Sequence, residues 1–215
     1  MYDTLQNLPG LGETIRLTDF DGTALDQMTK MLGGVRHFRM EDIDRAIYPA
    51  TLYNEGWITA VLLRNDIAGG ATAVLPKRIY TLNTAGTTAF TLMQSIAGIG
   101  TTPDVTRLAV FADPFLPAAG CAYGYAFWGI VRGPTIGMTA AAHANAVDLA
   151  VGDRVTVANE ATGRIGGFAA PGSFQAAMDQ ANSVLGYALE AAPCSAVGEQ
   201  DIDKWVYATV PWFHG

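Results

Sequence analysis

Short runs of apolar and β-branched residues, separated by glycine and proline, fill the chain from about Thr51 onward. Residues 57–63 (WITAVLL) are apolar at successive positions, which predicts a strand that is buried on both faces. Further strand-like segments lie at 78–82, 105–111, 123–131, 154–157, 183–190 and 205–210. Because the turn-forming residues are dense and evenly spread, the pattern predicts a mainly β protein, built as a β-barrel or a sandwich.

The segment 123–131 gives the most detailed expectation. Successive side chains of a strand point to opposite faces, so the alternation assigns each residue to a side. One face carries Tyr123, Tyr125, Phe127 and Val131, and the other carries Gly124, Ala126, Trp128 and Ile130. The following Arg132-Gly133-Pro134 predicts a turn that ends the strand.

The first 50 residues have a different character, since they hold 13 of the 33 charged residues. In 23–32, Leu25, Met28 and Leu32 recur at helical spacing, with Thr23 as a helix cap and Gly33 as a stop. Residues 40–47 predict one or two further helical turns. The chain is therefore expected to have a partly helical N-terminal arm, residues 1–50, and a β-rich domain, residues 51–215.

Composition narrows the function classes. The chain has 215 residues, 13 Lys and Arg against 20 Asp and Glu, and a net charge of −7. With 50% hydrophobic and 15% charged residues it is too apolar for intrinsic disorder. The acidic balance argues against general nucleic-acid binding, which needs a basic face. Such a low content of charged residues favours a chain that buries part of its surface in an oligomer or larger assembly.

No segment predicts insertion into a membrane or export. No apolar stretch approaches the roughly 18 residues that a membrane-spanning helix needs. The first residues lack a basic segment followed by an apolar run, so no signal peptide is expected. We therefore expect the chain in a cytoplasm or in a particle assembled there.

Cysteine and histidine give little sign of chemistry. Cys121 and Cys194 could pair, but nothing in the sequence requires it, and two small buried thiols are the favoured interpretation. His37, His143 and His214 are not spaced as metal ligands, so neither a metal nor a cofactor is predicted. A Gly-x-Ser-x-Gly nucleophile motif is also absent from the sequence.

The sequence Asp19-Phe20-Asp21-Gly22-Thr23 resembles the opening motif of haloacid-dehalogenase-like phosphatases. That resemblance implies that Asp19 is a nucleophile, that Asp21 handles the proton of the leaving group, and that Mg²⁺ is bound. The family motif follows a buried parallel strand, whereas residues 12–18 alternate with polar residues. Because the alternation of strands and helices is also missing, a turn followed by a helix cap is the favoured interpretation.

Two clusters are candidates for an interface with a subunit or partner. The basic cluster consists of Arg36, His37 and Arg39. The aromatic tail consists of Trp205, Tyr207, Trp212 and Phe213. A solvated charged face explains the first cluster equally well, because acidic residues follow at once. Docking into the chain's own core is the alternative for the second.

The C-terminal half, from about 120 to 210, resembles the capsid decoration (cement) proteins of tailed bacteriophages. The resemblance rests on 125–134 (YAFWGIVRGP), 149–157 (LAVGDRVTV) and 184–191 (VLGYALEA), followed by a terminal strand. It implies a compact β-barrel-like unit without catalytic chemistry. It also implies a homotrimer on the outside of the virion, bound to the major capsid protein, that stabilises the mature shell.

Rival functions remain open at this stage. Another virion component, such as a major shell protein or a head-to-tail adaptor, would differ by its copy number. The Asp19 and Asp21 phosphatase is a second rival. A carbohydrate-binding module is a third, suggested by Trp57, Trp128 and Trp205, although core packing better explains aromatic residues placed within strands.

Overall fold

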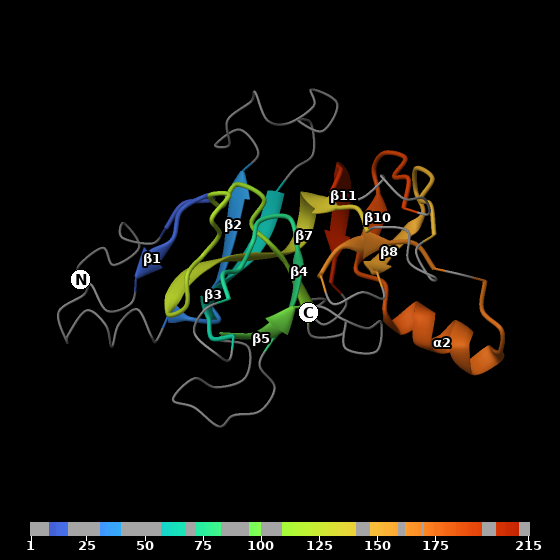
Figure 1. Ribbon diagram of the computed structural model, residues 1–215, viewed down its shortest axis with the longest axis horizontal. Helices are drawn as coiled ribbons and strands as arrows, with labels where there is room; N and C mark the ends of the chain where they lie inside the picture. The colour runs from blue at the N-terminus through green and yellow to red at the C-terminus, as the bar shows by residue number, and fades with distance from the viewer. Residues whose placement is uncertain are drawn as a thin grey trace.

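The computed structural model describes residues 9–16, 31–39, 57–67, 72–82, 95–99, 109–140, 147–158, 162–168, 170–194 and 201–210. Over these residues the protein is mainly β, with a closed five-stranded barrel, outer strands and one short helix (Figure 1). The predicted fold class is therefore confirmed. The helices expected over 23–32 and 40–47 lie almost entirely outside the described residues.

Five strands close the barrel: β3 (Trp57–Asn65), β4 (Ile79–Leu82), β5 (Ser95–Ile99), β6 (Ala109–Ala112) and β7 (Tyr125–Met138). Around the barrel they follow the order β3-β5-β4-β6-β7, and the β3–β7 pairing closes the ring. The β3–β5 pairing is parallel, and the other pairings of the ring are antiparallel. The strands predicted at 57–63 and 78–82 are confirmed. Of the third predicted strand, residues 105–108 lie outside the described residues and residues 109–111 lie in β6.

Alternate residues of these strands fill two separate apolar cores. The interior of the barrel contains Val61, Leu63, Tyr80, Leu82, Ile96, Val110, Phe127 and Val131. Their neighbours along the strands, such as Leu62 and Trp128, belong to the other core, on the outer face of the barrel. The face assignment predicted for β7 is therefore confirmed from Tyr125 onward, because its large side chains divide between the two cores as the alternation requires.

The predicted end of β7 at Gly133 is wrong. The strand continues to Met138, and its second half leaves the barrel to pair with β11 (Asp203–Thr209). Gly133 makes this possible because it has a φ of +103°, and a Cβ there would stand 2.5 Å from the carbonyl oxygen of Trp57. Glycine accepts both constraints, so the residue bends the strand where a turn was expected.

The outer sheet continues from β11 through β10 (Gly186–Ala188), β8 (Arg154–Val157) and β9 (Ile165–Gly166). Its inner face packs on the outer face of the barrel through Val155, Leu185 and Val206, which belong to the same core as Trp128. The strands predicted at 154–157 and 205–210 are confirmed. In Figure 1 this sheet lies beside the barrel, and α2 (Phe174–Asn182) projects from its far side.

The described residues of the N-terminal segment belong to the same β structure. Strand β1 (Ile15–Arg16) pairs with β7, and β2 (Val35–Arg39) pairs with β3. The indole Nε1 of Trp128 donates to the carbonyl of Pro9 at 2.6 Å. The buried carboxylate of Asp113 accepts from the backbone N–H of Gly12 at 2.5 Å. Residues 9–16 are therefore fastened across the outer face of the barrel.

Candidate interaction surface

The basic cluster of Arg36, His37 and Arg39 lies on β2, and all three residues are exposed. In the antiparallel pairing with β3, His37 is opposite Thr59 and Arg39 is opposite Trp57. Directly opposed residues share a face of the sheet. His37 and Arg39 therefore stand on the same side as Trp57, whereas Arg36 points to the other side.

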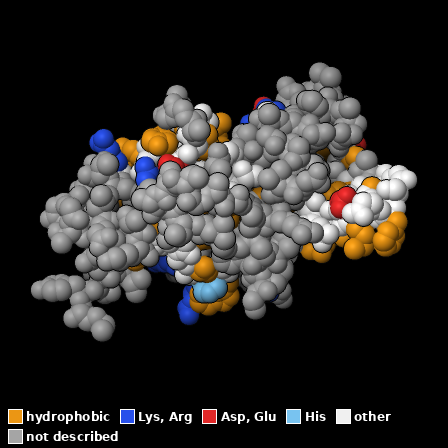
Figure 2. Space-filling view, turned by 90° about the horizontal axis from the view of Figure 1, so that it is seen from below, with side chains coloured by type: hydrophobic (Ala, Val, Ile, Leu, Met, Phe, Trp, Pro, Cys, Tyr) orange, Lys and Arg blue, Asp and Glu red, His pale blue; other side chains and the backbone are white. Residues whose placement is uncertain are grey.

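Trp57 is the centre of this surface, since 53% of it is exposed. The Arg39 guanidinium lies 5.0 Å from the centroid of the indole ring, and the His37 ring meets the indole edge-on with centroids 6.4 Å apart. His37 Nδ1 is also 3.0 Å from Thr59 Oγ1, which fixes the imidazole. Figure 2 shows a histidine beside hydrophobic and basic side chains at the lower edge of that view. Arg39 and His37 thus orient the indole and leave it accessible.

A further cation extends the surface across β3. Thr59 is opposite Arg132 of β7, and Arg132 is exposed. We call His37, Arg39, Trp57, Thr59 and Arg132 together the β2–β3 patch. Tryptophan and arginine are the residue types most enriched among those that dominate binding energy at protein interfaces.

On the opposite face of β2, Arg36 covers the edge of the core. Its guanidinium lies 4.8 Å from the centroid of the Phe38 ring. Phe38 is buried and meets Trp128 edge-on at 5.3 Å. The three basic residues, which are close in sequence, are thus divided between two faces, and β2 presents a positive charge on each.

Sequence reasoning missed Trp57 as part of this surface. Core packing was the favoured explanation for Trp57, Trp128 and Trp205, and it is wrong for Trp57. It is correct for Trp128, which is 1% exposed, and Trp205 is half-buried against the same core. The signal in the sequence is the basic cluster itself. The residue opposite an exposed Arg39 on the neighbouring strand shares its face of the sheet and therefore lies beside solvent.

The aromatic tail is only partly described. Trp205 and Tyr207 lie in β11, and Trp212 and Phe213 are outside the described residues. The backbone N–H of Trp205 donates to Glu190 Oε1 at 2.8 Å. Tyr207 is opposite Tyr187, which is 43% exposed, on the outer face of the sheet. Since β3 and β7 lie between β2 and β11, the structure does not join the basic cluster with Trp205 and Tyr207, the described residues of the aromatic tail.

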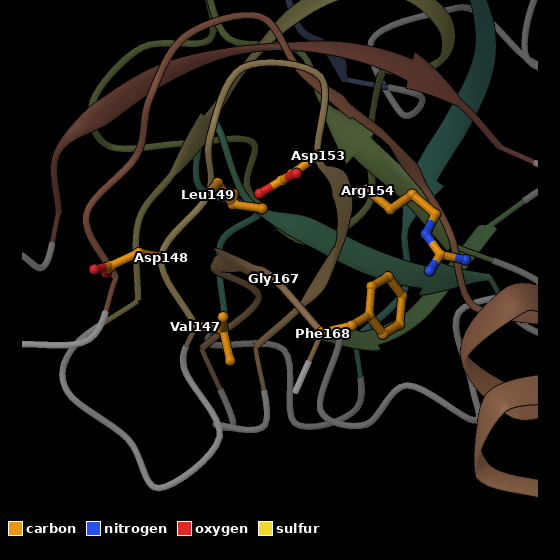
Figure 3. Close-up of a pocket in the computed structure, with 7 residues that line it drawn as sticks. All are labelled: Val147, Asp148, Leu149, Asp153, Arg154, Gly167 and Phe168. Atoms are coloured by element: carbon orange, nitrogen blue, oxygen red, sulfur yellow. The ribbon is translucent and has the colours of Figure 1, made fainter. Parts of the chain in front are cut away.

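One pocket of about 170 Å³ lies in the outer sheet region (Figure 3). Asp148 Oδ1 accepts from the N–H of Cys194 at 2.7 Å, and Asp153 Oδ2 accepts from the N–H of Ala150 at 2.8 Å. Figure 3 shows the Asp148 carboxylate turned away from Asp153, and Arg154 beside the ring of Phe168. Both carboxylates therefore hold backbone turns, and they do not converge on a common point.

The remaining predicted features concern chemistry. Cys121 and Cys194 are buried thiols that form no disulfide, as favoured, and burial raises the pKa of Cys121 to about 12. His143, His214, Asp19 and Asp21 are outside the described residues. Strand β1, which precedes Asp19, pairs antiparallel with β7, unlike the parallel strand of the phosphatase family. Within the described part of the chain, no three His, Cys, Asp or Glu side chains gather as metal ligands.

The helical content adds one observation. Over the residues that the structure describes, no helix has both the length and the apolar character required to cross a membrane.

Comparison of the chain with family models, with curated proteins and with solved structures finds no match.

Proposed function

We propose that this chain is a structural virion protein that binds the outer surface of a phage capsid and stabilises the mature shell. The observation that carries the proposal is the β2–β3 patch, an exposed tryptophan held between basic side chains on a strand of a closed barrel. A closed barrel keeps such a patch in one geometry, so little conformational entropy is lost when a partner binds. The resemblance of residues 120–210 to decoration proteins supplies the identity of that partner.

The proposed role is mechanical. A protein that binds the mature shell and not its precursor stabilises the mature state by mass action, by about 4 kcal/mol per site at 1,000 times Kd. These free energies sum over the many binding sites of a shell. The proposed partners are the major capsid protein and further copies of this chain in a homotrimer, and the proposed location is the exterior of the virion.

The test is the solution mass of the purified chain, measured by light scattering, together with co-sedimentation on purified capsids of the phage that encodes it. We expect a trimer that sediments with mature shells at stoichiometric copy number and does not sediment with precursor shells. A monomer that ignores both kinds of shell would contradict the proposal. A few copies per particle would indicate a connector component instead.

A further inference from the structure

We infer that the outer edge of β2 binds an extended acidic segment of the partner as an added β-strand. The inference rests on the proposed function for the identity of that partner, the shell protein, and on the structure for the chemistry of the contact. Three properties of β2 carry it: the direction of its backbone groups, the charge on its two faces, and the position of Trp57.

The backbone of β2 has hydrogen-bonding groups that point away from the sheet. Among the described strands β2 stands at one end of the strand order, and β3 is its partner. The N–H of Leu62 donates to the carbonyl of Gly34 at 3.0 Å, which identifies this pair as a hydrogen-bonded one. Such pairs alternate in an antiparallel ladder, so the N–H and C=O groups of Val35 and His37 point outward. Val35 is 48% exposed, so solvent reaches this part of β2.

The charge on β2 selects the partner. Arg36 is on one face of the strand, and His37 and Arg39 are on the other. If a second copy of β2 were paired along this edge, the three basic residues of each strand would be brought together on one short ladder, and like charges placed close together across strands destabilise a sheet. An added strand with Asp or Glu on either face meets a guanidinium instead. The edge therefore rejects its own copy and favours an acidic strand.

Trp57 gives the added strand an apolar contact. Its exposed ring lies beside Arg39, one strand inward from the edge. An apolar side chain of the partner that reaches over Arg39 covers the indole and excludes water from the cation–π pair, which strengthens it. A nucleic acid could neutralise the same arginines, but it has no alternating N–H and C=O groups to match those of Val35 and His37. The backbone pattern thus favours a peptide.

The first experiment follows the backbone amide signals of Val35 and His37 by NMR during titration with synthetic probes. The probes are a short peptide of alternating Glu and Val, the same peptide with Lys in place of Glu, and a single-stranded DNA oligonucleotide. We expect the acidic peptide to shift both amides and slow their exchange with water, with binding at least about fivefold weaker when salt is raised to several tenths molar. Equal response to both peptides, response to neither, or response to the oligonucleotide alone would overturn the inference.

The second experiment uses shells and a charge-reversed variant, Arg36→Glu with Arg39→Glu. Arg154→Glu is the control for charge reversal elsewhere, because Arg154 is also an exposed strand arginine, 5.8 Å from the ring centroid of Phe168, but on β8. We expect the double variant to sediment with mature shells at least about tenfold more weakly and the control to bind like wild type. If wild type and the double variant bind shells equally, the inference fails and the proposed function stands. If wild type ignores shells but still takes up the acidic peptide, the proposed function fails and the edge retains its specificity.

Discussion

The barrel and the outer sheet share one continuous strand, β7, but are stabilised differently. In the barrel, five strands close on an interior of large apolar side chains such as Leu63 and Phe127. The outer sheet extends from the second half of β7 through short strands, and its inner face includes small residues such as Ala188 and Ala208. At one end of it, Arg78 and Arg164 both bind the carboxylate of Asp201.

The barrel is the rigid part of the molecule, and the outer sheet is attached to it. Ring closure leaves the barrel without free edges, and its core is packed from every side. The outer sheet is joined to the barrel by one shared strand and by the apolar core between them. Its ion pairs lie at the surface, where such pairs stabilise proteins less. The β2–β3 patch lies on the barrel side of the molecule, so the surface proposed for docking belongs to the part with the more rigid support.

The largest expected effect comes from a matched pair of core truncations. Leu63→Ala removes a fully buried side chain inside the barrel, and Leu185→Ala removes one from the outer sheet. We expect a loss of about 4 kcal/mol in the free energy of unfolding for Leu63→Ala and about 2–3 kcal/mol for Leu185→Ala, because the closed barrel collapses less readily onto a cavity. Equilibrium unfolding in urea measures both, and a larger loss for Leu185→Ala would refute the comparison.

Gly133→Ala tests the junction between the two regions. A Cβ at Gly133 adds a 2.5 Å contact with the Trp57 carbonyl to the strain of a positive φ, and we expect a loss of about 3 kcal/mol. Gly152→Ala is the control, since Gly152 also has a positive φ, +87°, but nothing within 4 Å. It should lose only about 1 kcal/mol by the same unfolding measurement. Equal losses would show that the close approach to Trp57 does not constrain the bend.

Asp113, which accepts a hydrogen bond from Gly12, makes the free energy of unfolding dependent on pH. Burial raises the pKa of Asp113 to about 6, although the backbone N–H groups of Gly12 and Phe115 act in the opposite direction. A carboxyl with a raised pKa in the folded state binds a proton more readily there than in the unfolded chain. Its ionisation therefore costs stability, on the order of 2–3 kcal/mol above pH 6, and that cost disappears as the pH falls from about 6 to about 4.

The check is to compare wild type with Asp113→Asn, by urea unfolding, at pH 7 and at pH 4.5. We expect the free energy of unfolding of wild type, relative to that of the variant, to be higher at pH 4.5 than at pH 7, because the variant has no carboxyl to protonate at this position. Other carboxyl groups titrate in both proteins, so the difference between the two isolates Asp113. A difference that is constant with pH would mean that Asp113 does not change its protonation in this range.

The smallest expected effect is at the ion pairs of the outer sheet. Burial alone would raise the pKa of Asp201, but the hydrogen bonds and charges of Arg164 and Arg78 outweigh it and lower the pKa. Asp201→Asn keeps a residue type that tolerates the positive φ of 61° at this position. We expect a loss below about 1 kcal/mol at neutral pH, which shrinks as acidification protonates Asp201 in wild type. A loss as large as that of Leu63→Ala would show that ion pairs hold the outer sheet.

Much of the fold could be predicted because alternation has a direct structural meaning. The two faces of β7 follow from the order of Phe127, Trp128 and Ile130 in the sequence. The division of the basic cluster between the faces of β2 follows from the same rule, once β2 is known to be a strand. Such features depend on neighbouring residues alone.

Other features depend on contacts between distant parts of the chain. Gly133 bends β7 without ending it because it lies against the backbone of Trp57, and no local pattern contains that contact. Trp57 begins an apolar run, so its exposure follows only from its place opposite Arg39. Helix α2 was not predicted, and its apolar residues Phe174 and Met178 remain exposed, so no buried apolar face marks it. In β10, Tyr187 is exposed between buried Gly186 and Ala188.

Hydrogen exchange of the chain, free and bound to mature shells, tests the central claim most directly. The account predicts that binding slows exchange of the Val35 and His37 amides, while amides of α2 and of the outer face around Tyr187 exchange as they do in the free chain. Unchanged exchange along β2, with protection at α2 or Tyr187 instead, would contradict it.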